Sequence, residues 1–282
     1  MKKILPVLLL FVFPLMGLSA GQEYTVSNTR EFLDALGSNR TIIVKQGEYD
    51  LSNYVTSTGA SHYYRDTYDG AELVLNEIEN LTIRGVGSNL THFITRPSYG
   101  NVFVLVGCSN VKFESIKAGH GPEKGYCTGG VIYLEDCMEI EINNCLLYGS
   151  GIEGLTAEGS QDISLNNTAI QGCTYSILSL SGCTTVNFSA CKFFDNEEFD
   201  MVNLNNCHEV TFKGCKFRNN RSNTDYSGQK FLNFSGTSSI LFKKCNFEKN
   251  RAPYFGRDEY DAEFKKCKMS GNTWTKGKYS ED

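Results

Sequence analysis

A repeated unit dominates this sequence and limits the folds that it can adopt. Four segments align without gaps: VIYLEDCMEIEINNCLL (131–147), ILSLSGCTTVNFSACKF (177–193), MVNLNNCHEVTFKGCKF (201–217) and FLNFSGTSSILFKKCNF (231–247). More degenerate copies begin at Leu75 and Leu105, a copy with two residues inserted begins at Leu155, and a half-copy begins at Phe264. The central apolar positions of successive copies are 30, 29, 23, 23, 24, 30 and 22 residues apart. A unit of 22–24 residues with occasional insertions is typical of one coil of a solenoid.

Apolar residues alternate with polar ones inside each copy, as in Leu178/Leu180 and Val186/Phe188. A period of two indicates strands, and no copy has a helical period. Two-residue polar joints such as Ser189-Ala190 separate three short strands in each copy. The pattern therefore predicts an all-β fold, a single parallel β-helix of about eight coils. The consensus of leucine-rich repeats is absent.

Eleven cysteines are many for one chain, but most of them occupy equivalent places in the repeat. We expect one inward column of Cys108, Cys137, Cys183 and Cys207, and a second of Cys145, Cys191, Cys215, Cys245 and Cys267. Stacked neighbours have parallel Cβ vectors, which suits buried thiols better than disulfides. A further column of Asn196, Asn220, Asn250 and Asn272 follows the third strand and predicts stacked amides. Cys127 and Cys173 lie outside the columns, where a disulfide between them, or a reactive pair of Cys127 with His120, remains open.

The two ends differ in how they can be closed. The segment NTREFLDALG (28–37) predicts a short helix with Asn28 as its cap, and its apolar face can plug the first coil. The C-terminal stretch WTKGKYSED (274–282) is too short to plug much of the other end, which leaves an edge where something can dock. Residues 1–20 read as a secretory signal peptide, with Lys2 and Lys3 before an apolar run and no lipid-attachment cysteine. We expect one domain over 21–282, with a cap over 21–50 and coils over 72–272, in a secreted or periplasmic protein.

A net charge of −5 and scattered basic residues disfavour nucleic acid as a partner. No later stretch is long and apolar enough to predict a membrane span. Zinc-type cysteine spacing is absent, and the acidic residues are too dispersed to predict a calcium site. We therefore expect neither a metal nor a cofactor.

The strand-helix-strand start, the period, the two-residue joints and the asparagine column together resemble the right-handed parallel β-helix, or pectate-lyase-like, superfamily over about residues 22–275. The string GHGPEKGYCTGGV (119–131) is similar to one in exported bacterial β-helix proteins. Right-handedness follows from this resemblance and from the crossover rule for parallel strands. Gly119-His120-Gly121 also resembles polygalacturonase-like hydrolases, but the Asp motifs and the Arg-Ile-Lys motif of those enzymes have no counterpart here.

Long insertions emerge between the third strand of one coil and the first strand of the next, over 55–71, 89–101, 119–130, 220–230 and 250–260. Long loops on a rigid scaffold commonly carry function. The first three insertions combine aromatic rings with charged groups, as a sugar-binding groove requires. The substrate-binding candidates are His62, Tyr64, Arg65, Asp66, Tyr68, Tyr99, Lys124, Tyr126 and the outward-facing Tyr133.

The catalytic candidates are His120, Arg96, Glu123 and Glu153. Alternation from Leu155 places Glu153 inward, beside Ile132 and Leu178, unless the strand bulges there. No complete hydrolase or lyase set is recognisable. The sequence therefore leaves two functions open: an exported protein that binds and cleaves a polysaccharide, as a lyase or a hydrolase, or a non-catalytic structural or adhesive surface module.

Overall fold

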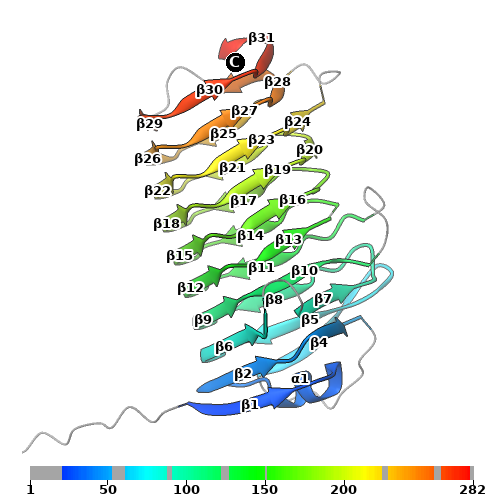
Figure 1. Ribbon diagram of the computed structural model, residues 1–282. Coiled ribbons are helices and arrows are strands. Elements are labelled where there is room, and N and C mark those ends of the chain that lie inside the picture. The colour runs from blue at the N-terminus through cyan, green and yellow to red at the C-terminus, as the bar shows by residue number, and fades with distance from the viewer. Residues whose placement is uncertain are drawn as a thin grey trace, which may run out of the picture.

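The chain folds into a solenoid of parallel strands whose coils stack along one axis (Figure 1). The computed structural model describes residues 21–52, 61–87, 91–121, 127–149, 151–223, 228–256 and 262–279. Three strands in each middle coil contribute to three long sheets, which we call sheets A, B and C. The predicted all-β parallel β-helix is confirmed.

The strands of each sheet follow the order of the coils. Sheet A contains β1 (Gln22–Val26), β2 (Arg40–Val44), β6 (Glu79–Gly85), β9 (Ser109–Glu114), β12 (Met138–Asn143), β15 (Gln161–Asn166), β18 (Thr184–Ser189), β22 (His208–Lys213), β26 (Ser238–Lys243) and β29 (Ala262–Lys265). Sheet B contains β3 (Gly47–Asp50), β7 (Thr91–Thr95), β10 (Ile116–His120), β13 (Leu146–Tyr148), β16 (Ala169–Gln171), β19 (Lys192–Phe194), β23 (Lys216–Arg218), β27 (Asn246–Glu248) and β30 (Lys268–Ser270). Sheet C contains β4 (His62–Thr67), β5 (Gly70–Asn76), β8 (Phe103–Val106), β11 (Ile132–Glu135), β14 (Leu155–Glu158), β17 (Leu178–Ser181), β21 (Val202–Asn205) and β25 (Leu232–Ser235).

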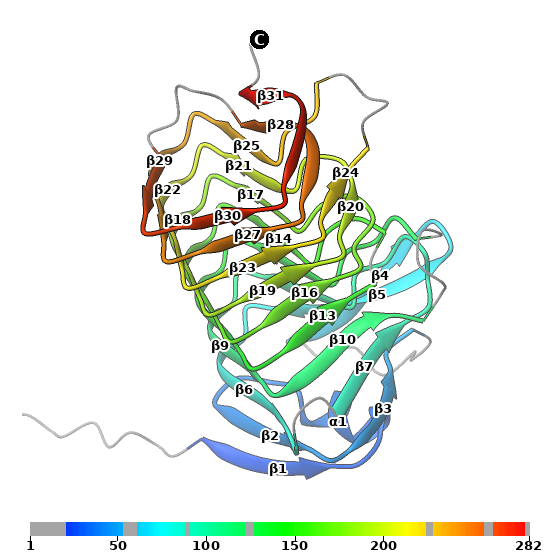
Figure 2. The same ribbon diagram turned by 45° about the horizontal axis from the view of Figure 1, so that its top comes forward.

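Two features were not predicted. β4 pairs antiparallel with β5, so part of the 55–71 insertion is a hairpin rather than a loop. A fourth sheet, sheet D, consists of β20 (Glu197–Glu198), β24 (Arg221–Ser222), β28 (Arg251–Gly256) and β31 (Thr273–Tyr279). Sheet D lies on the side where the insertions emerge (Figure 2). The insertions after residue 220 are therefore partly ordered as strands.

A residue with positive φ turns the chain at the seven corners between sheets A and B from β9 onward. The corner residues are Ser115, Asn144, Asn167, Ala190, Gly214, Lys244 and Lys266, with φ between 48° and 67°. A single left-handed residue changes the chain direction sharply without using a long loop. Each of these residues belongs to a two-residue joint of the kind that the sequence predicted.

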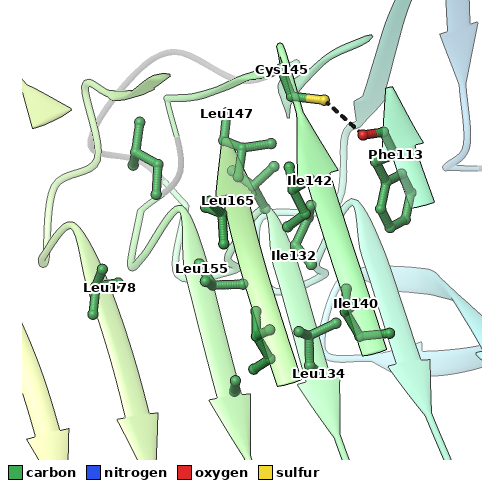
Figure 3. Packing of buried hydrophobic residues seen from close by; sticks show 14 of the residues in the cluster. Phe113, Ile132, Leu134, Ile140, Ile142, Cys145, Leu147, Leu155, Leu165 and Leu178 are labelled. Atoms are coloured by element: carbon green, nitrogen blue, oxygen red, sulfur yellow. Dashed lines mark hydrogen bonds between the residues drawn. The ribbon is translucent and has the colours of Figure 1, made fainter. Parts of the chain in front are cut away.

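Inward side chains fill the interior in layers, one layer for each coil (Figure 3). Leu155 pairs with Ile132 and Leu178, and Ala157 pairs with Leu134. The predicted two-residue insertion in this copy is therefore wrong, because Ala157 and Ser160 replace the usual Leu and Cys without any change of register. Glu153 consequently precedes the row of Ile132, Leu155 and Leu178 instead of belonging to it, and this strand pairs without a bulge.

The two predicted cysteine columns are confirmed as free thiols, all of them buried except Cys267, which is partly exposed. Each thiol donates to a backbone carbonyl of the preceding coil, as Cys145 does to Phe113 (3.6 Å, Figure 3) and Cys215 to Phe188 (3.3 Å). Ser160, Thr168 and Thr237 replace cysteine in three coils, where the hydroxyl accepts from the amide of the preceding Cys. Each of these positions lies at a tight corner and carries a small side chain with a hydrogen-bond donor.

The asparagine ladder is confirmed as well. The side-chain amide of Asn196 donates to Asn220 (2.9 Å), that of Asn220 to Asn250 (2.9 Å) and that of Asn250 to Asn272 (3.0 Å). Each amide also donates to a backbone carbonyl of the preceding coil, as Asn220 does to Phe193. Since Asn196, Asn220 and Asn250 are buried, these bonds satisfy polar groups that water cannot reach.

The predicted helix α1 (Thr29–Ala35) closes the N-terminal end. The Asn28 side chain caps it by accepting from the amide of Glu31, and Glu31 accepts in return from Ser27. Phe32 is fully buried, and its ring lies 4.8 Å from that of Phe93 and 6.4 Å from that of Phe103. The helix is therefore the apolar plug of the first coils.

Candidate functional site

The outward face of sheet C carries two parallel rows of polar side chains. One row runs through Tyr133, Thr156, Ser179, Asn203 and Asn233, and the other through Glu135, Glu158, Ser181, Asn205 and Ser235. All ten are at least partly exposed, whereas the residues between them are buried. The predicted alternation, in which polar residues of the sheet C strands face outward, is confirmed. Glu158 belongs to the second row because Leu155 is in register with Ile132.

A charged network joins the N-terminal end of this face to the loops. Nη2 and Nε of Arg65 both contact one carboxylate oxygen of Glu72 (2.7 and 2.8 Å), and the other oxygen of Glu72 accepts from the backbone and side-chain amides of Asn101 (2.8 and 2.9 Å). Asn101 accepts in turn from the amide of Gly130 (2.9 Å). Glu72 is buried, so this network holds the hairpin and two insertions in one arrangement.

Tyr133 lies beside the carboxylates of the outward rows. Burial raises the pKa of Tyr133 to about 12, and the charge of Glu158 and a hydrogen bond with it act in the same direction, with Glu135 adding a smaller effect. The phenol is therefore protonated at neutral pH and donates to the Glu158 carboxylate. Arg65 acts in the opposite direction on the same pKa, which locates it near this group.

Two tyrosines form an exposed aromatic platform next to the network. The rings of Tyr68 and Tyr99 lie 5.1 Å apart at 59°, and the residues are 88% and 50% exposed. Asp69 holds the platform by accepting from the amides of Ser98 (2.6 Å) and Tyr99 (3.1 Å). Burial raises the pKa of Asp69, but these hydrogen bonds outweigh it, so the pKa is lowered and the group is ionised at neutral pH.

The three catalytic candidates within the described residues contact different parts of the chain. His120 ends β10 and is buried, with Nε2 on the carbonyl oxygen of Gly130 (2.9 Å), and burial lowers its pKa. Arg96 donates to Asp50 (2.6 Å) and lies 3.9 Å from Glu48. Glu153 accepts from Ser176 (3.2 Å) and Thr156 (3.4 Å), and burial raises its pKa. Glu123, like the binding candidates Lys124 and Tyr126, lies outside the described residues.

The remaining binding candidates divide between the interior and the surface. His62 is buried beside the hydroxyl of Ser61 (3.4 Å), and burial lowers its pKa. Tyr64 packs partly against the core. Asp66 is exposed on β4. Of the others, Arg65 lies near Tyr133, whose pKa it lowers, and Tyr68 and Tyr99 are exposed and contact each other.

A packing contact explains the first glycine of Gly119-His120-Gly121. A Cβ atom at Gly119 would lie 2.4 Å from the ring of Tyr148 and 2.5 Å from its carbonyl oxygen. The Tyr148 hydroxyl lies 2.6 Å from Nε2 of His92, and the Lys117 ammonium lies 4.5 Å from the centre of the ring. Gly119 thus permits a tyrosine to cross the strand, a role that requires no hydrolase chemistry.

Cys127 and Cys173 are both buried free thiols. Burial raises the pKa of Cys127, and its thiol faces the carbonyl oxygen of Gly149 at 3.7 Å. A thiol with a raised pKa is a poor nucleophile at neutral pH. Within the described ranges, no three His, Cys, Asp or Glu side chains gather as a metal site. The same ranges contain no helix that is long and apolar enough to cross a membrane.

The chain belongs to the right-handed β-helix family. The family profile described as "Right handed beta helix region" matches residues 53–234 and 101–278, which establishes the right-handed, pectate-lyase-like fold class. No curated protein matches the chain.

Solved structures share the fold at low sequence identity. An alginate lyase from Paenibacillus sp. str. FPU-7 is 12% identical with a TM-score of 0.52, over 92% of this chain and 98% of that one. A pectin methylesterase from Aspergillus niger is 10% identical with a TM-score of 0.51, over 94% and 90%. The pectate lyase Pel9A is 12% identical with a TM-score of 0.51, over 93% and 79%. At these identities the likeness establishes the architecture alone.

Proposed function

We propose that the protein is exported and binds a polysaccharide along the outward face of sheet C. The observation that carries this proposal is the continuous double row of polar side chains on sheet C, and the exposed platform of Tyr68 and Tyr99 supports it. Aromatic faces stack on sugar rings, and short hydroxyl and amide side chains hydrogen-bond to sugar hydroxyls. Apolar leader residues 1–20 support the location outside the cytoplasm.

The spacing of the rows suits a linear polymer. Successive strands of a sheet lie about 4.8 Å apart, so each coil offers one pair of polar groups at nearly the length of a sugar residue in an extended chain. Five coils contribute to the rows, from β11 to β25. A polysaccharide lying along the solenoid axis would therefore meet a repeated set of contacts.

The charges on this face favour a neutral glycan. Arg65 is already paired with Glu72, while Glu135 and Glu158 place two carboxylates on the outward surface. A sugar that carries a carboxylate would be repelled by these groups. The proposed ligand therefore differs in charge from pectate and alginate, the acidic polymers named for the similar lyases.

Binding is supported better than cleavage, because His120, Arg96 and Glu153 each have partners within the chain. One observation favours hydrolysis as a second function. Glu135 and Glu158 are paired on adjacent strands and both face outward. The strand spacing is close to the separation of about 5 Å between the two carboxylates of a retaining glycosidase.

Affinity electrophoresis and calorimetry against matched neutral and uronate-containing polysaccharides test the binding proposal. We expect a neutral glycan to bind, and we expect Tyr99→Ala and Asn203→Ala to weaken binding at least about tenfold, given the energy of an aromatic or hydrogen-bonding contact. Thr211→Ala, an equivalent polar truncation on the outward face of sheet A, should leave affinity unchanged. Binding to no glycan, or equal weakening by Thr211→Ala, would refute the proposal.

Product analysis tests the second function separately. New reducing ends that disappear in Glu135→Gln and in Glu158→Gln would support hydrolysis by this pair. Glycan binding without any new ends would assign the protein to the non-catalytic class of surface modules. Cleavage that persists in both variants would place the chemistry elsewhere on the chain.

A further inference from the structure

The C-terminal end of the solenoid exposes side chains that every earlier coil buries. The rings of Phe188, Phe212, Phe242 and Phe264 stack 4.5–4.9 Å apart with interplanar angles of 2–4°. The first three are fully buried, but Phe264 is 39% exposed. Met269, which continues the column of Phe217 and Phe247, is 45% exposed. Apolar surface at an open end of a solenoid normally requires a cover.

The backbone at this end is also unpaired. Within the described residues, β29 pairs only with β26 and β30 only with β27, so each strand leaves one edge without a neighbour. A strand edge offers a row of N–H and C=O groups to any strand that can lie beside it. Figure 1 shows β29 and β30 at the end of the stack, with β31 above them.

We propose that β29 is the docking edge for a second copy of this chain, which pairs with it antiparallel about a two-fold axis at Phe264. Glu263 and Lys265 flank Phe264 and both face outward. The two-fold axis puts Glu263 of each copy opposite Lys265 of the other, and the two Phe264 rings beside each other. A contact of this kind is self-complementary, as a two-fold interface must be.

Charge complementarity selects this register over its neighbours. A shift by one residue pairs Glu263 with Phe264 and mixes the outward and inward faces, which strand geometry disfavours. An axis at Glu263 places two glutamates opposite each other, and an axis at Lys265 places two lysines opposite each other. Glu263 and Lys265 already form an ion pair within the chain, so their charged groups can reach each other.

The resulting assembly is closed. Helix α1 plugs the N-terminal end with buried apolar residues, and the described residues at that end expose no equivalent stack of aromatic rings. Two copies joined at their C-terminal ends would bury both exposed columns at once. A closed dimer covers the exposed apolar side chains of both copies and cannot extend into a fibre.

Sedimentation equilibrium on the full chain and on its charge variants tests the proposal. We expect the wild type to reach twice the chain mass as concentration rises. Glu263→Lys and Lys265→Glu should each weaken self-association at least about tenfold, because each puts like charges opposite each other twice in the interface. An equimolar mixture of the two variants, and the double variant Glu263→Lys/Lys265→Glu, should dimerise again, because opposite charges then face each other.

Lys213→Glu is the matched control, because Lys213 occupies the column of Lys265 two coils away from the edge. It should dimerise as the wild type does, and thermal melting should show that all variants are folded. A wild type that stays monomeric at every concentration overturns the proposal. So does a failure of the mixture to restore dimers, or a loss of dimers in the Lys213→Glu control.

Discussion

Replacing Asn220 by Ala tests how much the buried asparagine ladder stabilises the solenoid. The side chain of Asn220 donates to Asn250 (2.9 Å) and Phe193 (3.0 Å), and accepts from the backbone (3.2 Å) and side-chain (2.9 Å) amides of Asn196. The variant therefore loses these four hydrogen bonds in a site that water does not reach. At about 1 kcal/mol for each bond, the free energy of unfolding should fall by about 3–4 kcal/mol.

The control is Asn166→Ala, because Asn166 also donates across coils, to Asn143 (2.9 Å), but is exposed. Water can replace that bond, so the loss should stay below about 0.5 kcal/mol. Urea unfolding followed by circular dichroism measures both values from the midpoint and the slope. A cost for Asn220→Ala below about 1 kcal/mol, or one equal to that of Asn166→Ala, would refute the argument that burial makes the ladder structural.

Three further predictions concern the loop region and the cysteines. Gly119→Ala should destabilise the fold by about 2 kcal/mol or more, because the added methyl group meets both the ring and the backbone of Tyr148. The control is Gly121→Ala, where the nearest atom lies 3.3 Å from the added Cβ atom. It should cost less than about 1 kcal/mol in the same urea assay. Burial lowers the pKa of His120, so the unfolded state binds the proton more readily and stability should fall as pH drops below about 6.5. His120→Asn should flatten that dependence between pH 8 and pH 5. An unchanged slope would contradict the lowered pKa of His120. Cys267 is the one cysteine that is not fully buried, so a thiol reagent should modify it first in the native protein, and rapid labelling of all eleven cysteines would contradict the buried columns.

The sequence predicted the features that repeat with the coils. Alternation located the inward residues, and stacking of equivalent positions located the cysteine and asparagine columns, because in a solenoid each position contacts its own equivalents. The same reasoning failed at Leu155, where Ala157 and Ser160 replaced the large and sulfur-containing residues that mark the register. That error hid Glu158 from the outward row.

The parts of the candidate site that were not predicted depend on contacts between irregular segments. Asp69 holds the amides of Ser98 and Tyr99, and Glu72 holds Asn101, across about thirty residues in each case. Neither contact leaves a periodic signal. Sheet D escaped prediction for the same reason, because β24 and β28 begin insertions of different lengths and β20 has only two residues.

The uniform register of the middle coils makes them interchangeable units of length. Leu155 pairs with Leu178 without any shift, and the amide of Gly154 donates to the carbonyl oxygen of Ile177 (3.1 Å). Removal of residues 155–177 would therefore join Gly154 to Leu178, a residue equivalent to the one that it now precedes. The solenoid would shorten by one strand spacing, about 4.8 Å, with the layers on either side still matched. The number of such coils therefore determines the length of polymer that the outward face can span.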